Sequence, residues 1–322
     1  MTTADATHSD DDSDGDRGGD SGSLGAQPIV HPIVVVGAGY TGRRVLTAEP
    51  GATAIGRTKP SIPGANVNFV RFDLDHDQDP HDHGDGVADA LSLSPGAAVL
   101  YTVPPPREGD DDPRLARFLA RLTTRPARIV YLSTTGVYGD RGGARVTECD
   151  EPRPATARAR RRLAAESLLQ AWCAAHRVEN VVLRVPGIYG PGRLGVDRLA
   201  AGAEILREAD SSPGNRIHVD DLARCCLAAL KPETLPGIYN VGDGDERSSG
   251  AFSRAVCEQA GLPAPEEIDL ATAKQRWSPM RLSFVLESRR VDVSKMRERL
   301  CVELQYADPL AGIRASLQST DV

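Results

Sequence analysis

The sequence predicts an α/β fold: a doubly wound parallel sheet of the Rossmann type with a smaller, mixed C-terminal lobe. Three observations support this prediction. A continuous β-branched run at Pro32–Val36 is typical of a strand that is buried on both faces. A glycine-rich turn, Gly37–Gly42, follows it directly. Further along the chain, short apolar runs alternate with helical patterns, which is the arrangement of βαβ units.

Strands and helices are predicted to alternate through residues 28–190, which we take as the Rossmann domain. The predicted strands are 32–36, 52–56, 67–70, 97–103, 128–133 and 180–185, and the predicted helices are 40–49, 113–122 and 156–176. After Pro191-Gly192 the pattern changes to helices and short strands, at 196–208, 220–230, 237–241, 248–260, 292–300 and 308–318. Residues 191–322 are therefore expected to form the smaller, substrate-holding lobe, interleaved with the sheet.

Composition places the chain among globular proteins and excludes several kinds of partner. Of the 322 residues, 40% are hydrophobic, which is enough for a sizeable core and excludes collagen-like, coiled-coil and wholly disordered chains. The formal net charge is −7, and seven Asp and one Arg within residues 1–25 account for most of it. The body has no basic excess, so no nucleic-acid partner is expected. Residues 1–27 are predicted to be a disordered acidic tail, with an acidic interaction tail as the alternative.

Cysteine usage and hydropathy predict a cytoplasmic protein. The six cysteines show no C-x-x-C spacing and are expected to be reduced, mostly buried thiols. The N-terminus is acidic, so no signal peptide is expected, and the chain has no 18-residue apolar run, so no membrane span is predicted. The stretch His76–Asp85 is predicted to be a solvated insertion; a metal-binding loop is the alternative, and no metal site is predicted.

The turn Gly37-Ala38-Gly39-Tyr40-Thr41-Gly42 has the G-x-G-x-x-G pattern between a predicted strand and a predicted helix. In a dinucleotide site the first glycine permits the tight turn, the second lets the backbone approach a pyrophosphate, and the third allows close helix–strand packing. The helix N-terminus adds N–H donors and a positive dipole. We therefore expect Gly37, Gly39, Tyr40, Thr41 and Gly42 to bind a dinucleotide; an ordinary glycine-rich turn is the alternative.

The end of the second predicted strand favours NADP(H) over NAD(H). An NAD site would place Asp or Glu there to hold the ribose 2′-hydroxyl, whereas the chain has Gly56-Arg57-Thr58. Arg57 is expected to pair with a 2′-phosphate, with no carboxylate beside it to repel that group; a solvated arginine is the alternative. Asp73, after the third strand, is a candidate for the adenine end of the cofactor, with a loop-capping role as the alternative.

A set of motifs follows in a fixed order along the rest of the chain. They are Leu132-Ser-Thr-Thr-Gly-Val-Tyr-Gly139, Glu148-x-x-Glu151-x-x-Pro154, Leu183-Arg-x-x-Gly-Ile-Tyr-Gly-Pro-Gly192, Arg216-Ile-His-Val-Asp-Asp-Leu-Ala223 and Gly237-Ile-Tyr-Asn-Val-Gly242. In this order they resemble the extended short-chain dehydrogenases/reductases, the nucleotide-sugar epimerase/dehydratase superfamily. The resemblance runs from Ile33 to about Ser316 and implies a Rossmann fold with a nicotinamide cofactor.

The resemblance implies a catalytic Ser/Thr, Tyr and Lys, of which this chain keeps only the first. Thr134 matches the Ser/Thr that binds the substrate oxygen. The Tyr-x-x-x-Lys pair is absent, because alignment places Arg158 at the tyrosine and Arg162 at the lysine, and none of the seven tyrosines has Lys four residues later. Arg162 is expected to hold the cofactor ribose, but guanidinium does not deprotonate near neutral pH and so Arg158 cannot replace the tyrosine as a proton donor.

The missing pair leaves three functional hypotheses open. The first is an atypical NADP(H)-dependent reductase or epimerase-like enzyme, acting on a carbonyl or nucleotide-sugar substrate, with Tyr138 or Tyr189 as the substitute donor in a loop facing the cleft. For each tyrosine a packing role is the alternative. The second is a non-catalytic NADP(H)-binding sensor, and the third is a protein that acts through its acidic tail.

Substrate and assembly signals in the sequence are few. Arg193 and Arg216 are predicted at the carboxyl edge of the sheet, where arginines suit a diphosphate or carboxylate; ion pairing with neighbouring aspartates is the alternative. His218 is expected to cap the helix that starts near Asp220, and Glu166 to pair with Arg162 on a helix surface. By analogy with the resembled family, the 156–176 helix would form a homodimer interface.

Overall fold

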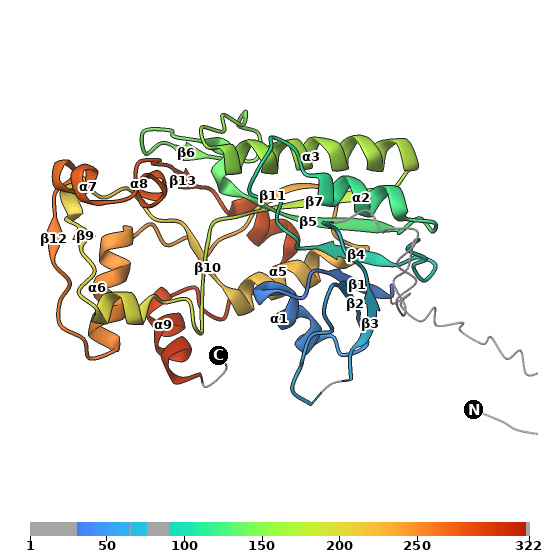
Figure 1. Cartoon of the computed structure of the whole chain (residues 1–322), viewed down its shortest axis with the longest axis horizontal. Coiled ribbons are helices and arrows are strands. Elements are labelled where there is room, and N and C mark those ends of the chain that lie inside the picture. The colour runs from blue at the N-terminus through green and yellow to red at the C-terminus, as the bar shows by residue number, and fades with distance from the viewer. Residues whose placement is uncertain (1–30, 65, 76–89, 320–322) are drawn as a thin grey trace, which may run out of the picture. The chain divides into compact units, whose positions relative to one another are not determined.

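The computed structural model describes residues 31–64, 66–75 and 90–319 (Figure 1). The predicted acidic tail, residues 1–27, and the His- and Asp-rich stretch, His76–Asp85, lie entirely outside the described residues. The described residues from His31 onward group as one compact unit.

A parallel sheet forms the centre of this unit, as predicted. Its strands in the described ranges are β1 (Ile33–Val36), β2 (Thr53–Gly56), β3 (Asn68–Arg71), β4 (Ala98–Tyr101), β5 (Arg128–Thr134), β7 (Glu179–Val185) and β11 (Gly237–Asn240). They lie in the order β11-β7-β5-β4-β1-β2-β3, and every neighbouring pair is parallel. The order reverses direction between β1 and β4, which is the switch point where α/β sheets bind ligands. The predicted Rossmann architecture is therefore confirmed.

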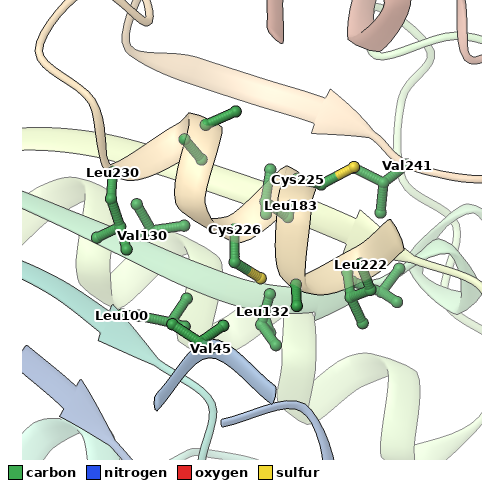
Figure 2. Packing of buried hydrophobic residues seen from close by; sticks show 14 of the residues in the cluster. Val45, Leu100, Val130, Leu132, Leu183, Leu222, Cys225, Cys226, Leu230 and Val241 are labelled. Atoms are coloured by element: carbon green, nitrogen blue, oxygen red, sulfur yellow. The ribbon is translucent and has the colours of Figure 1, made fainter. Parts of the chain in front are cut away.

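The central strands are continuous apolar runs because both faces of the sheet are covered. Helices α1 (Tyr40–Ala48) and α5 (Val219–Leu230) cover one face, and α2 (Pro113–Arg121) and α3 (Ala157–His176) cover the other (Figure 1). Figure 2 shows how α5 packs: its apolar side chains lie against those of the neighbouring strands, with Leu222, Cys226, Leu230, Leu100, Val130, Leu132 and Leu183 among the labelled residues. Alternate residues of each strand thus enter two separate cores.

The region after β7 builds a smaller lobe and also returns to the sheet. Its further elements are β8 (Gly187–Tyr189), α4 (Val196–Ala200), β9 (Ile205–Leu206), β10 (Arg216–His218), α6 (Ser249–Gln259), β12 (Glu267–Ile268), α7 (Leu270–Arg276), α8 (Pro279–Val285), β13 (Arg290–Val291) and α9 (Pro309–Gln318). β13 pairs with β6 (Arg145–Val146). The pattern at 196–208 divides into α4 and β9, and that at 292–300 ends in a π-helical turn, Met296–Leu300.

Strand β11 lies at the edge of the sheet, where side chains occupy its outward backbone groups. Lys295 donates to the carbonyl of Ile238 at 2.6 Å, and the N–H of Asn240 donates to Glu148 at 2.8 Å. These contacts cover an edge that would otherwise be open to pairing with another strand.

Cysteine burial follows the sequence prediction for four of the six residues. Cys173, Cys225, Cys226 and Cys257 are buried free thiols, whereas Cys149 and Cys301 are free but exposed. Across the described ranges, none of the helices combines the length and the apolar character needed to cross a membrane.

Candidate functional site

The turn between β1 and α1 requires glycine at its first position. Gly37 has a φ of +91°, and a Cβ there would lie 2.7 Å from Cγ2 of Val103 and 2.8 Å from Oγ1 of Thr102. The Thr102 hydroxyl donates to the carbonyl of Gly37 at 2.6 Å. The left-handed backbone and these contacts together exclude any other L-residue.

The second and third glycines have opposite surroundings. A Cβ on Gly42 would lie 2.2 Å from the carbonyl oxygen of Gly37, so only glycine lets α1 approach β1 this closely. A Cβ on Gly39 would meet no described atom within 4 Å, and no side chain caps α1 at this residue. Open space beside an uncapped helix N-terminus fits a pyrophosphate bound by backbone N–H groups. The residues present thus fit a dinucleotide.

Tyr40 and Thr41 have structural side chains. The Tyr40 hydroxyl donates to the carbonyl of Pro191 at 2.9 Å, and the guanidinium carbon of Arg193 lies 3.8 Å from the centre of its ring. Thr41 is buried. The side chain of Tyr40 therefore joins α1 to the turn after β8, and only the backbone of these two residues remains for a phosphate. Arg193 makes no ion pair with a described aspartate, contrary to the alternative considered from the sequence.

The surroundings of Arg57 differ from the prediction in one respect. Asp75 lies beside it, with Oδ2 accepting from Nη1 of Arg57 at 3.1 Å, so the expectation of no nearby carboxylate is wrong. Arg114 pairs with the same carboxylate at 2.5 Å, which leaves two guanidiniums to one carboxylate. Asp73 accepts from the backbone N–H of Asp75 at 2.8 Å, as in the loop-capping alternative. Arg57 is largely exposed, and Arg114 shares the Asp75 carboxylate with it.

Thr134 and Arg162 both lie near the carboxyl end of β5. Thr134 Oγ1 accepts from the N–H of Gly136 at 3.1 Å, which leaves the hydroxyl proton free to donate. Arg162 Nη1 donates to the carbonyl of Leu132 at 2.7 Å and to the Tyr131 hydroxyl at 3.0 Å. The guanidinium is thus held against the strand, near the place where the resemblance puts the family's lysine.

The two tyrosines considered as substitute donors do not face a cleft. Tyr138 is fully buried and its hydroxyl donates to Asn240 Oδ1 at 2.7 Å; burial raises its pKa. Tyr189 belongs to β8, is 4% exposed, and its buried hydroxyl has no hydrogen-bond partner among the described residues; burial raises its pKa as well. The expectation that both lie in cleft-facing loops is wrong, and the packing alternative describes both.

Glu166 and Arg162 do not form the predicted surface pair. Glu166 is buried, and its Oε2 accepts from Nη2 of Arg184 at 2.7 Å, while the Ser133 hydroxyl donates to Oε1. The guanidinium of Arg184 also lies 4.8 Å from the centre of the Tyr138 ring. This buried ion pair joins α3 to β7 directly beneath the end of β5, and it holds the backbone that presents Thr134.

Two adjoining cavities lie in this region: the larger is lined by residues of the smaller lobe alone, and the smaller reaches from that lobe to the end of β5. One has a volume of 380 Å³ and the other 200 Å³, and Ser249, Phe284 and Val285 line both. Thr135, next to Thr134, lines the smaller one together with Arg216, Glu287 and Arg289. Their combined size is within the range of about 300–1,000 Å³ that is typical of ligand sites.

Arginines give these cavities a positive character. Arg216 is 8% exposed, donates to the carbonyls of Arg247 at 2.8 Å and Ser248 at 3.4 Å, and has no ion pair with a described residue, so the ion-pair alternative is wrong. Burial lowers its pKa. In the larger cavity, burial and the neighbouring charge of Arg198 lower the pKa of Arg281. Each cavity is lined by two arginines and one glutamate, Arg216 and Arg289 with Glu287 in the smaller and Arg198 and Arg281 with Glu204 in the larger, and this excess of guanidinium groups suits an anionic ligand.

Two other expectations concern ligands and caps. His218 Nδ1 accepts from the N–H of Asp220 at 3.2 Å and so caps α5, as predicted. Among the described residues there is no cluster of three or more His, Cys, Asp or Glu side chains that would hold a metal. A larger cavity, of 670 Å³, lies between α3, β7 and β11, and none of its lining residues is a predicted site residue.

Phe284 and Asp75 are site residues that the sequence did not indicate. Phe284 lies in α8, which the sequence patterns did not predict, and no motif marks it. Asp75 stands two residues after Asp73, in the loop that follows β3. Because Arg57 follows the neighbouring strand β2, a carboxylate in that loop was the available signal for a partner of Arg57.

Comparisons with known proteins agree with the motifs. Residues 114–242 match the model of the NAD dependent epimerase/dehydratase family. The dTDP-L-rhamnose 4-epimerase of Burkholderia thailandensis is 29% identical over 130 residues, which are 36% of this chain and 36% of that protein, so the match spans about a third of the relative's length.

Solved structures share the fold over most of the chain. A functionally unknown conserved protein from Silicibacter pomeroyi DSS is 28% identical, with a TM-score of 0.69 over 89% of this chain and 98% of that chain. MoeE5, solved in complex with UDP-glucose and NAD, is 20% identical, with a TM-score of 0.66 over 89% and 98%. The resemblance seen in the motifs is thereby confirmed: residues 114–242 match the NAD dependent epimerase/dehydratase family, and the solved structures share the fold over most of the chain.

Proposed function

We propose that the protein is an NADP(H)-dependent oxidoreductase or epimerase-like enzyme whose substrate is a sugar nucleotide or another carbonyl compound. The observation that carries the proposal is the glycine turn, in which Gly37 and Gly42 permit close packing while Gly39 faces open space at a helix N-terminus. The two adjoining arginine-containing cavities, of which the smaller is lined by Thr135, supply the second requirement, a place for an anionic substrate. The relatives that carry epimerase names and the neighbour solved with UDP-glucose and NAD support the same reaction class.

We assign one set of residues to the cofactor and another to the substrate. Backbone N–H groups at residues 39–42 bind the pyrophosphate, Arg57 binds the 2′-phosphate, Asp73 lies toward the adenine and Arg162 holds the nicotinamide ribose. When bound, the cofactor supplies or accepts a hydride. The Thr134 hydroxyl donates a hydrogen bond to the substrate oxygen and so holds it in place. Arg216 and Arg281 neutralise the diphosphate of the substrate.

Replacing Arg57 with Gln is expected to weaken NADPH binding about tenfold, because one charge-assisted contact to the 2′-phosphate is lost. NADH binding is expected to stay unchanged, since NADH lacks that phosphate. The measurement is a calorimetric titration of wild type and variant with NADPH and NADH side by side. Arg125→Gln is the matched control, because this exposed arginine precedes β5 at the opposite end of the sheet. Equal affinity of the wild type for both cofactors would contradict the NADP(H) preference, and binding of neither would contradict the cofactor site.

A non-catalytic NADP(H) sensor is the second candidate, and the presence of arginine at residues 158 and 162 favours it, since no Tyr–Lys pair is available to transfer a proton. NADPH oxidation with a panel of carbonyl compounds and sugar nucleotides distinguishes the two. For an enzyme, Thr134→Ala is expected to lower kcat about 10²–10³-fold, as loss of a donor to the developing oxyanion does. Thr134→Ser, which keeps the hydroxyl, should retain most activity. Tight NADPH binding by the wild type with no turnover on the panel would support the sensor.

A further inference from the structure

Arg158 stands where the resemblance places the family's catalytic tyrosine, and its surroundings suggest a different use of that position. It is the second residue of α3 and is exposed. Its guanidinium carbon lies 4.4 Å from the centre of the Phe284 ring in α8. Within the described part of the chain, no carboxylate pairs with it and no carbonyl accepts from it. The guanidinium is therefore held by an aromatic face while its N–H donors remain unused.

Phe284 connects this guanidinium to the substrate cavities, since the ring on which Arg158 stacks lines both of them, while Arg158 itself lines neither. Its side chain is 63% exposed and lines both the 380 Å³ and the 200 Å³ cavity. None of the described residues of α8 is fully buried; Leu282 and Val285 pack against a small core of the lobe, and the opposite side of the helix forms an outer wall. Arg158 thus reaches from the Rossmann side of the molecule to this wall. Thr135 also lines the smaller cavity, and the residue before it, Thr134, is the proposed hydrogen-bond donor to the substrate oxygen.

Stacking on an aromatic ring prepares a guanidinium for an anion. The ring fixes the guanidinium plane through a cation–π contact but leaves the N–H groups at its edge free. A carboxylate accepts two of these N–H groups in parallel, a geometry that a Lys ammonium does not reproduce. The arginines that line the cavities, Arg198, Arg216, Arg281 and Arg289, lie in the smaller lobe, and two of them, Arg216 and Arg281, are assigned to the diphosphate. Arg158 instead comes from α3, on the side of Thr134, where the reacting end of the substrate lies.

We propose that Arg158 is a substrate-recognition residue that binds a carboxylate on the reacting sugar, so that the enzyme selects sugar nucleotides of the uronic acid type over neutral ones. This inference rests on the proposed function, because it assumes that a sugar nucleotide occupies the two cavities. It assigns no proton transfer to Arg158. The residue aligned with the family's tyrosine would then determine which substrate binds and would take no part in proton transfer.

The test compares UDP-glucuronic acid with UDP-glucose, two ligands that differ by a carboxylate in place of a hydroxymethyl group. By calorimetry, the wild type is expected to bind UDP-glucuronic acid at least about fivefold more tightly, as expected for a charge-assisted pair that is partly exposed. Arg158→Gln should remove this preference with little change in the affinity for UDP-glucose, and Arg158→Lys should restore part of it. The preference should shrink as salt is raised, since the pair is exposed.

Two further variants separate recognition from a general structural effect. Arg160→Gln is the matched control, because Arg160 is exposed on the same turn of α3 and, among the described residues, its guanidinium hydrogen-bonds to the carbonyl of Ala155 alone. It should keep the wild-type preference. Phe284→Leu should reduce the preference, because the guanidinium loses its support. Equal binding of the two ligands by the wild type, or an unchanged preference in Arg158→Gln, would overturn this inference and leave the sugar-nucleotide proposal standing. Binding of neither ligand would contradict the proposed substrate class and overturn the inference with it.

Discussion

Alanine at residue 39 is expected to weaken NADPH binding about a hundredfold, the equivalent of one or two charge-assisted hydrogen bonds, while the free energy of unfolding changes by less than about 0.5 kcal/mol. The reason is that a Cβ on Gly39 meets no described atom within 4 Å, so the fold accommodates the methyl group. The same methyl group occupies the space into which the pyrophosphate must come. Calorimetric titration and urea unfolding of the Gly39→Ala variant measure the two quantities.

Alanine at residue 42 provides the contrasting control. Its Cβ would lie 2.2 Å from the carbonyl oxygen of Gly37, so α1 must move away from β1. Overpacking of this kind costs about 1–3 kcal/mol, and Gly42→Ala should therefore lower stability as well as binding. If Gly39→Ala bound NADPH as tightly as the wild type, the open space at the helix N-terminus would not be the phosphate site.

Loss of the buried carboxylate of Glu166 is expected to have the largest effect on stability. In the wild type, Glu166 Oε2 accepts a hydrogen bond from Nη2 of Arg184 at 2.7 Å. In Glu166→Ala this carboxylate is lost, while the Arg184 guanidinium, which is only 2% exposed, keeps its charge. Removing one partner of a buried pair costs about 3–5 kcal/mol, because an uncompensated charge remains in the interior. Urea denaturation measures the change in the free energy of unfolding.

An exposed ion pair supplies the comparison. Glu267 pairs with Arg254 at 2.7 Å but is 42% exposed, so Glu267→Ala should change the free energy of unfolding by less than about 1 kcal/mol. A similar small change in Glu166→Ala would show that water reaches Arg184 and that this pair does not support the end of β5.

The core of the fold and the cofactor turn were predictable from the sequence because their signals are local. Strand β4 is a run of buried residues and β1 nearly so, and a continuous apolar segment of this length is visible without knowing what it contacts. The glycines at residues 37, 39 and 42 are spaced by the geometry of one tight turn and the first turn of a helix. The turn can therefore be recognised from the local sequence alone. Thr134 was found through the motif around it.

The remaining site features depend on residues that are far apart along the chain, and only the tertiary structure decided them. Periodicity could not show that Glu166 faces β7 and Arg184 rather than solvent and Arg162, because α3 has residues of both kinds on several sides. Tyr138 meets Asn240 across 102 residues, and Asp75 reaches Arg57 only because β3 lies beside β2. Arg158 acquires a ring to stack on from α8, a helix 126 residues further along the chain, whose place is determined by the packing of the smaller lobe. Local sequence determines which backbone a segment adopts, whereas burial and charge pairing depend on the partner that the folded chain brings to each side chain.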